Sequence, residues 1–320
     1  MCVEYLLGKR ELISFSDFEG SYGSAGATKV LLGRDAKFTP KNINNWTEVK
    51  GAGTDSVDID VYELGIKGVG GSLEFAPQNW KFLNFVLLAA GTGTTDTSST
   101  TYFTHTYTNA KTVGSFTVER AIQATTDRVR TYAGCQVNRL GISFDAGAGG
   151  FVAASLDLMA RDVANSTSTT SLTELKTEAF KARMATITVA GNVEVACLSG
   201  NFSIENNLDA GRYANYDNDK RLKSESGVTK RLVSGTLTIN ISDDTYFDLW
   251  KAITKVSGAC SLKLTRGTND TATFTFNNFY CEDAPDPTNL EGINNVTLNF
   301  KATSVSAVIV DALSDYRTFG

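Results

Sequence analysis

The chain has 320 residues, of which 42% are hydrophobic, with a formal net charge of −5 and a pI of about 5.1. This acidic balance is not the basic bias of nucleic-acid-binding proteins, and the longest apolar helical candidate, residues 82–90, is too short to span a bilayer. Residues 1–13 lack a basic start followed by an apolar core, so we expect no secretory signal and assembly in a cytoplasm.

The composition predicts an all-β protein with many turns, because threonine is abundant and there are 28 glycines but only 4 prolines. The five cysteines are scattered and form no CxxC pair, so we interpret them as small, mostly buried side chains rather than metal ligands. They are Cys2, Cys135, Cys197, Cys260 and Cys281.

The first clear elements begin after an N-terminal segment, residues 1–55, whose role the pattern leaves open. Residues 37–53 fit either a strand or a long ordered loop. Residues 71–91 then form a strand that changes into a helix, since Leu73 and Phe75 alternate with polar residues and Pro77 ends the strand. Trp80 and Leu83 lie at helical spacing and are predicted to anchor this helix.

The remainder of the first half is read as a polar loop followed by strands. Residues 92–101 have no apolar anchor and predict a mobile loop. Two strands, 102–109 and 114–121, follow around a tight turn. Residues 135–144 and 151–162 form a hairpin, and the alternation of the first of these strands slips once. Its predicted inward residues are Cys135, Val137, Leu140 and Ile142.

A serine- and threonine-rich segment separates two predicted halves, a first domain at 1–165 and a second at 185–320, with residues 166–184 as the linker. Within the second half, residues 208–228 are a long polar stretch, typical of a solvated or interface loop. Its candidate contact residues are Arg212, Tyr213, Asp217, Asp219, Lys220 and Arg221.

The second half repeats the strand-to-helix unit at residues 235–258. Leu237, Ile239 and Ile241 alternate along a strand, and Ser242 or Asp243 is predicted to cap a helix that Gly258 ends. Phe247 and Trp250, at helical spacing, are the predicted anchors of this helix against the sheet, with Ile253 on the same stripe.

The two halves align in order, which predicts a duplicated fold. Each half has a strand-to-helix unit, two strands and a closing strand; the first half adds the strand at 135–144. The closing strands match residue by residue: Leu156, Leu158 and Ala160 correspond to Leu298, Phe300 and Ala302.

The candidates for chemistry are few, and the sequence predicts no enzyme, cofactor or metal site. The single histidine, His105, lies on an alternating strand, and there is no GxSxG motif. Acidic pairs such as Asp58 with Asp60 and Asp283 with Asp286 suggest calcium or glycosidase chemistry, and we consider both improbable; Asp243 and Asp244 favour helix capping. The glycine run at 68–71 favours a bulge or a close backbone contact over a phosphate loop.

Several stretches carry a family resemblance. The segments RTYAGCQVNRLGISFDAGAGGFVAASLDLMARD, SGNFSIENNLDAGRY and KRLVSGTLTINISDDTYFDLW resemble the tail tube proteins of long-tailed bacteriophages. In that family a strand of the Ser199–Asn207 type precedes a long polar loop, and a strand of the Arg231–Trp250 type runs into a helix. The resemblance covers most of residues 57–162 and 185–305.

The resemblance implies two tandem β-sandwich domains, each with a short flanking helix, contributing to a ring-shaped inner β-barrel. Such rings stack into the tail tube of a siphovirus-like virion, assembled in the host cytoplasm. The implied partners are further copies of the chain, a tape-measure protein, tail terminator and distal tail proteins, and genomic DNA that passes without specific binding. A ring would contain six chains, or three if both halves contribute equally to the barrel. Residues 208–228 would reach between rings, with 37–53 as a weaker counterpart.

Two further expectations follow. DNA sliding through a tube favours a lumen with more Asp and Glu than Lys and Arg, since basic groups would retain the phosphates. The alternative reading is a carbohydrate-binding or adhesive β-sandwich, for which Trp46 and the threonine-rich strands would serve; it predicts a protein that binds glycans and does not polymerise.

Overall fold

The structure, a computed structural model, describes residues 11–32, 36–41, 43–49, 61–78, 91–97, 102–122, 127–147, 150–170, 172, 178–193, 197–209, 227–240, 245–283 and 295–312. These residues form an antiparallel all-β fold in which 18 strands are linked by hydrogen bonds. None of the helices in this part of the chain has the length and apolar character to cross a membrane. The all-β prediction is therefore confirmed.

Within the described residues, eleven strands lie in the first half and seven in the second. Those of the first half are β1 Glu11–Phe18, β2 Thr28–Leu31, β3 Lys37–Pro40, β4 Ile43–Val49, β5 Val61–Phe75, β6 Gly91–Thr97, β7 Phe103–Asn109, β8 Phe116–Ile122, β9 Arg128–Asp145, β10 Ala153–Ala160 and β11 Asp162–Ser166. The described residues after β11 contain seven strands and two short helices. In chain order they are η1 Ala182–Met184, β12 Ala185–Val189, β13 Asn192–Val193, β14 Cys197–Glu205, β15 Leu232–Asn240, α2 Thr245–Lys251, β16 Ser261–Gly267, β17 Asp270–Asp283 and β18 Asn295–Asp311.

Eight of these strands form one continuous sheet. Their order is β3-β5-β10-β9-β14-β15-β18-β17, every neighbouring pair antiparallel. We call this the eight-strand sheet. Its first four strands come from the predicted first half and its last four from the second. Because β9 pairs directly with β14, the sheet runs from one half into the other without a break.

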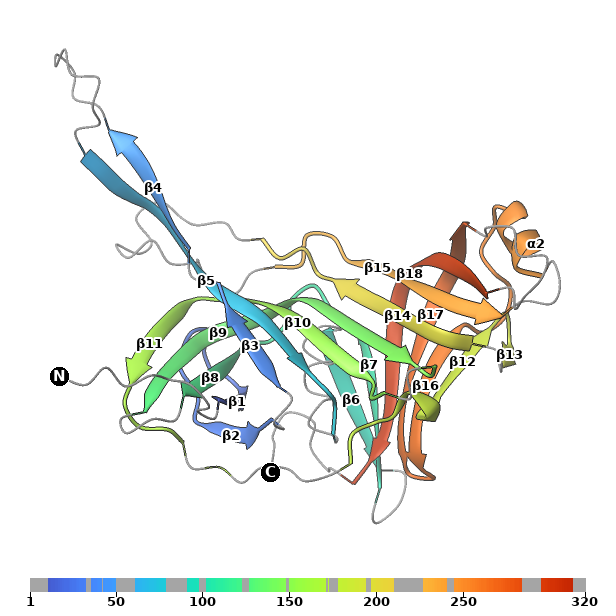
Figure 1. Cartoon of the computed structure of the whole chain (residues 1–320), viewed down its shortest axis with the longest axis horizontal. Helices are drawn as coiled ribbons and strands as arrows, with labels where there is room; N and C mark the ends of the chain where they lie inside the picture. Colours follow the sequence, from blue (N-terminus) through green and yellow to red (C-terminus); the bar gives the residue numbers. More distant parts are fainter. Residues whose placement is uncertain are drawn as a thin grey trace.

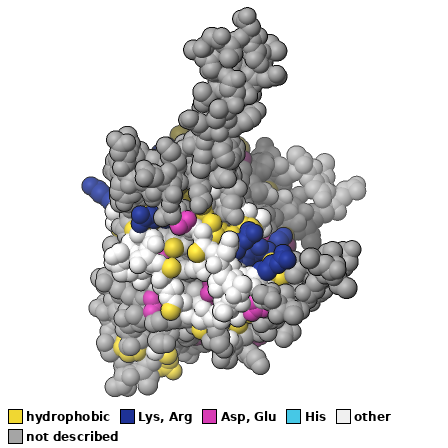
Figure 2. All heavy atoms as spheres, turned by 90° about the vertical axis from the view of Figure 1, so that its left-hand side faces the viewer, with side chains coloured by type: hydrophobic (Ala, Val, Ile, Leu, Met, Phe, Trp, Pro, Cys, Tyr) yellow, Lys and Arg dark blue, Asp and Glu magenta, His cyan; other side chains and the backbone are white. Residues whose placement is uncertain are grey.

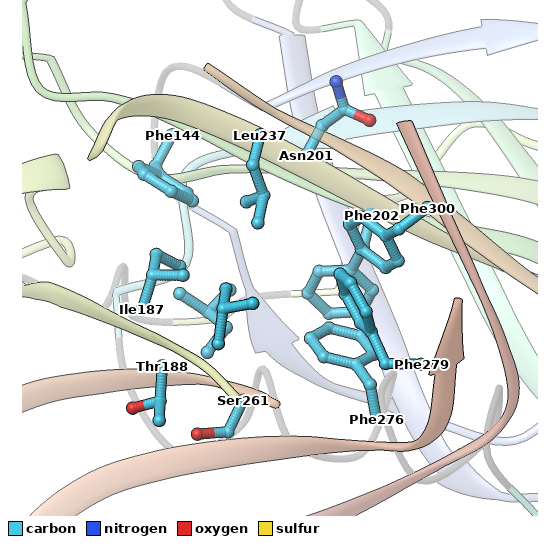
Figure 3. Close-up of a pocket in the computed structure, with 12 residues that line it drawn as sticks. Phe144, Ile187, Thr188, Asn201, Phe202, Leu237, Ser261, Phe276, Phe279 and Phe300 are labelled. Carbon is cyan, nitrogen blue, oxygen red and sulfur yellow. The ribbon is translucent and has the colours of Figure 1, made fainter. Parts of the chain in front are cut away.

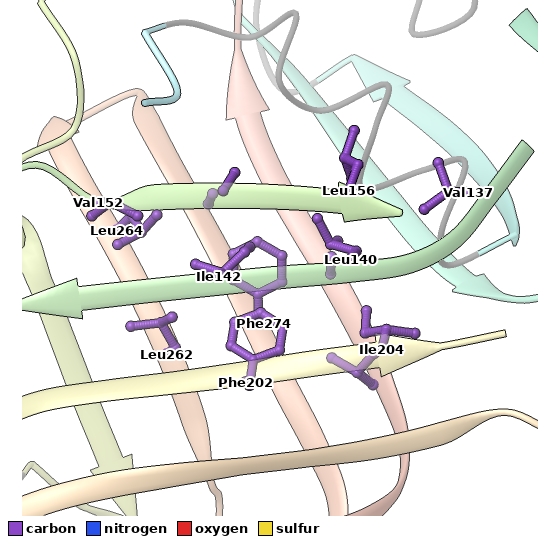
Figure 4. Packing of buried hydrophobic residues seen from close by; sticks show 14 of the residues in the cluster. Val137, Leu140, Ile142, Val152, Leu156, Phe202, Ile204, Leu262, Leu264 and Phe274 are labelled. Carbon is purple, nitrogen blue, oxygen red and sulfur yellow. The ribbon is translucent and has the colours of Figure 1, made fainter. Parts of the chain in front are cut away.

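A second layer packs against one face of this sheet. Strands β17 and β18 are long enough to enter both layers: residues 295–302 of β18 pair with β15 in the eight-strand sheet, and residues 307–311 pair with β7. Strands β9, β10, β14 and β15 run side by side and cross over β16 and the remaining parts of β17 and β18 (Figure 1). Between the layers lies one hydrophobic cluster with members from both halves, such as Leu140, Leu156, Phe202 and Phe274 (Figure 4). The halves thus share a core and a sheet, and their division into two tandem domains stays a prediction.

The predicted hairpin at residues 135–162 is confirmed. β9 pairs with β10, and Cys135, Val137, Leu140 and Ile142 are all buried. The slip in the alternation is also present: the register shifts between Val137 and Arg139, so that Asn138 bulges out of the pairing with β10. Of the cysteines in the described residues, Cys135 and Cys260 are buried, and Cys197 and Cys281 are half-buried.

The glycine run at 68–71 is a close backbone contact, as predicted. A Cβ on Gly70 would lie 2.2 Å from the Leu158 carbonyl oxygen, and one on Gly71 would lie 2.6 Å from the Thr39 carbonyl oxygen. Only glycine allows β5 to fit between β3 and β10 at this point.

For residues 92–121 one prediction is wrong, and the two predicted strands are confirmed. The segment predicted as a mobile loop forms β6, which pairs with β7 from Gly91 to Thr97, because threonine-rich segments form strands well when a partner strand is present. Strands β7 and β8 exist but are not paired with each other. β7 pairs with β6 and β18, and β8 pairs with β1 and β9, so the turn between them connects two layers.

The predicted linker is partly structured. β11 pairs with β9, and the end of the segment is buried at Phe180 and Ala182. Phe180 donates its backbone N–H to the Pro77 oxygen, and its own oxygen accepts from the Val152 N–H. Residues 178–184 are therefore part of the core rather than a free connection.

Candidate assembly surfaces

One face of the eight-strand sheet is polar and points away from the core. Because opposite residues in a sheet share a face, the register places Ser72, Asp157, Arg139 and Glu205 in one row, and Asn201, Thr236 and Asn299 in another. We call this surface the polar face. Its uncharged members are mainly serine, threonine and asparagine, while the alternate residues of the same strands, such as Leu73 and Leu298, fill the core.

Acidic side chains outnumber basic ones on the described part of the polar face. The carboxylates are Glu74, Asp145, Asp157, Glu205, Glu282 and Asp283, and the basic side chains are Lys37, Lys41, Arg139 and Lys301. Arg139 Nε lies 3.4 Å from Glu205 Oε1, and Lys301 forms an ion pair with Glu282. Six carboxylates against four basic side chains leave the described part of the polar face net negative. The left-hand end of the molecule, which Figure 2 shows face on, carries a cluster of Lys and Arg beside dispersed Asp and Glu.

The junction between β9 and β14 is held by a buried asparagine at the end of β14. Asn206 is fully buried, and its backbone N–H donates to the Asn138 oxygen at 2.7 Å while its Nδ2 donates to the Val137 oxygen at 2.8 Å. Arg231 Nε donates to Asn206 Oδ1 at 2.7 Å, and burial lowers the pKa of Arg231. Asn206 therefore fixes β14 to the bulge of β9.

Replacing Asn206 with alanine is expected to destabilise the chain by about 1–3 kcal/mol, because it removes the side-chain donor to the Val137 oxygen and the acceptor of the Arg231 Nε–H. Asn201→Ala is the matched control: Asn201 is exposed on the same strand, and its Nδ2 donates to Thr236 Oγ1. Urea unfolding of both variants measures the difference. Equal midpoints would show that the clamp at Asn206 contributes little.

The strand pairing has the same register in the two halves of the eight-strand sheet. β10 places Leu156 opposite Leu73 and Leu158 opposite Gly71. β18 places Leu298 opposite Leu237 and Phe300 opposite Gly235. The residue-by-residue correspondence predicted for the closing strands is thus present in the pairing, which supports the duplication.

A long arm extends from the first half, and the second half has a long connection at the matching place in the chain. After β3 the chain runs into β4, which pairs with the first part of β5 and projects from the body (Figure 1). After β14 it runs into residues 206–231 before returning as β15. The predicted contact residues Arg212, Tyr213, Asp217, Asp219, Lys220 and Arg221 lie outside the described residues.

The helix anchors need correction. Trp80 and Leu83 lie outside the described residues. In α2, Tyr246 is buried and Leu249 packs against the core, whereas Trp250 is 40% exposed and contacts Phe247 at 5.5 Å between ring centroids. The prediction that Trp250 anchors the helix is wrong for the isolated chain. The helix also ends at Lys251 rather than near Gly258, and Ile253 has a φ of 52°.

The residues with catalytic potential serve the fold. His105 on β7 is 1% exposed, and its Nε2 lies 3.0 Å from Asp311 Oδ1 on β18. Within the described residues, no cluster of three metal-ligating side chains occurs. A small cavity between the layers is lined mainly by apolar side chains such as Ile187, Leu237 and Phe276 (Figure 3). We interpret it as a packing gap, because it lacks converging charged groups.

Sequence reasoning missed the role of Asn206, although a signal was present. An Asn-Asn pair follows a strand in each half, at Asn44-Asn45 and at Asn206-Asn207. That the two Asn-Asn pairs fall at matching positions is visible only once the halves are aligned by register.

The described residues thus form a two-layer β fold whose outer sheet face is polar. A family model described as Phage tail tube protein matches residues 45–303. The chain belongs to this family of tail tube proteins, structural components of the virion tail. None of the curated proteins matches the chain.

Proposed function

We propose that the chain polymerises as stacked rings into a tail tube and that the polar face of the eight-strand sheet lines the lumen through which DNA leaves the virion. One observation carries the proposal: eight paired strands expose a polar, net negative surface of Ser, Thr, Asn and carboxylates on the side away from the core. A lumen of this kind presents few cations to phosphates, so DNA slides without retention.

We further propose three chains per ring. The resemblance implies a six-unit ring when each chain has one unit. Here each half supplies four strands to one continuous sheet, so one chain fills two units. The arm formed by β4 and β5, and residues 206–231 in the second half, would then reach toward the neighbouring ring. The tape-measure protein, tail terminator and distal tail proteins are the further partners, and assembly takes place in the host cytoplasm.

Negative-stain microscopy of the concentrated protein tests the proposal. Annular particles or tubes with a central bore are expected, and mass measurement of separated rings should give three times the chain mass of 34.4 kDa. Globular particles that bind a glycan array and never polymerise would instead support the adhesive alternative.

The lumen assignment makes a charge prediction. Asp157→Lys is expected to produce tubes that retain short DNA duplexes, with binding that weakens steeply as salt rises, because the new cations face the phosphates in every subunit. Asp248→Lys on α2 makes the same charge change at an exposed site away from the polar face and is the control. Fluorescent DNA retained by assembled tubes gives the readout. Equal retention by both variants would place the polar face outside the lumen.

A further inference from the structure

We infer that a ring closes when the free edge of β17 in one copy pairs with the edge formed by β3 and β4 in the next copy, with Asp283 opposite Ile43 as Arg139 is opposite Glu205 inside each chain. The partner is a second copy of this chain, and the inference rests on the proposed ring. The pairing of β9 with β14, which joins the two halves of one chain, would then show how two neighbouring chains pair.

The first step is that β9 and β17 are equivalent on their outer edges. β9 bulges at Asn138, between the partners of Leu158 and Asp157. β17 bulges at Glu282, between the partners of the corresponding Phe300 and Asn299. Three residues before Val137 and Cys281 the chain enters the left-handed region in both strands, at Gly134 with a φ of 68° and at Asn278 with a φ of 49°. Bulges bend and twist a strand, so β9 and β17 share the same local shape.

The second step is that β3 and β14 are equivalent. Thr39 lies opposite Ser72 and Asn201 opposite Thr236, each next to the matching Gly71 or Gly235. The carbonyl oxygens of Thr39 and Asn201 are the backbone atoms that a Cβ on these two glycines would meet, at 2.6 and 2.2 Å. The register continues through Ile43 opposite Gly68 and Glu205 opposite Leu232, so that the two Asn-Asn pairs fall at the same positions.

The third step is that the two edges are complementary in position. In the described residues, β3 pairs only with β5, and the last part of β17 pairs only with β18. The last pair of β9 with β14, Arg139 with Glu205, maps onto Asp283 and Ile43, which are both described.

A junction between two different edges is head-to-tail, and such interfaces form rings when the rotation between subunits closes. The same pairing also covers both exposed edges of the eight-strand sheet, which otherwise invite uncontrolled strand addition. The same kind of strand pairing would thus join the halves within a chain and cover the edges at β3 and β17 between chains.

A cysteine pair tests the register. Asp283→Cys combined with Ile43→Cys places two thiols at the mapped position of Arg139 and Glu205, where directly opposed Cα atoms lie within disulfide range. After mild oxidation of assembled protein, non-reducing denaturing electrophoresis should show covalent dimers and closed trimers. Arg139→Cys with Glu205→Cys is the matched control, and it should form a link within one chain that changes mobility without changing mass.

The outcomes separate this inference from the proposed function. Rings or tubes that form while the control pair links and the Asp283–Ile43 pair does not would overturn the junction and leave the tube intact. Links that appear equally in the single variants Asp283→Cys or Ile43→Cys would also overturn it, because native thiols rather than the register would then account for them. Failure of the unmodified protein to form rings would instead contradict the proposed function.

Discussion

Replacing Phe274 with alanine is expected to lower the free energy of unfolding by about 3–5 kcal/mol, the range for truncating a buried aromatic side chain. Phe274 on β17 is fully buried, and its ring centroid lies 5.1 Å from that of Phe202 on β14. These side chains join the two layers where strands of both halves meet (Figure 4). Urea unfolding of the unassembled subunit provides the measurement.

Trp250→Ala is the matched control for Phe274→Ala. It removes a larger aromatic side chain, but one that is 40% exposed on α2, so we expect a loss of only about 1 kcal/mol. A Trp250 variant as unstable as the Phe274 variant would mean that α2 contributes far more to the subunit than its packing indicates. If the Phe274 variant unfolded at the wild-type midpoint, the shared core between the layers would not be what stabilises the chain.

The strands that the sequence predicted well are those with one buried face. Along β9, a period of two residues puts Val137, Leu140 and Ile142 on the core side, and the single slip in that period marks a real bulge at Asn138. An apolar alternation determines which face is buried. It does not determine the partner strand, because pairing such as β9 with β14 depends on contacts distant in sequence.

The errors have specific physical causes. Residues 92–97 have little apolar character, but a threonine-rich segment becomes a strand when a neighbour such as β7 satisfies its backbone groups. In α2 two apolar stripes compete, Phe247 with Trp250 and Tyr246 with Leu249, and a helix of seven residues is too short for spacing alone to choose between them. The structure selects the second stripe, since β17 lies against it.

The candidate assembly surface was predictable in kind but not in position. Acidic composition and a tail-tube-like pattern predict a net negative lumen, and the polar face is net negative in its described part; that it lines a lumen stays a proposal. Its residues could not be chosen from the sequence, because the same Ser, Thr and Asn alternation occurs on strands of both layers. The clamp at Asn206 depends on a bulge in β9, which lies about 70 residues earlier in the chain.

Removing either partner of the His105–Asp311 pair is expected to destabilise the chain by about 3–5 kcal/mol, the range for breaking a fully buried pair. Both side chains are buried, with His105 Nε2 3.0 Å from Asp311 Oδ1. The pair joins β7 of the first half to β18 of the second, where His105 lies opposite Ile309. The His105–Asp311 interaction therefore links a strand of the first half to a strand of the second half.

A double-mutant cycle separates this interaction from simple loss of packing. His105→Ala, Asp311→Ala and the double variant are compared by urea unfolding, and the double variant should lose less stability than the two single losses combined, because the second change removes a group that the first had already deprived of this bond. Strictly additive losses would show that the two side chains stabilise the fold independently. In that case β7 would be held to β18 by backbone pairing and apolar contacts such as those of Tyr107 and Ile309, both fully buried.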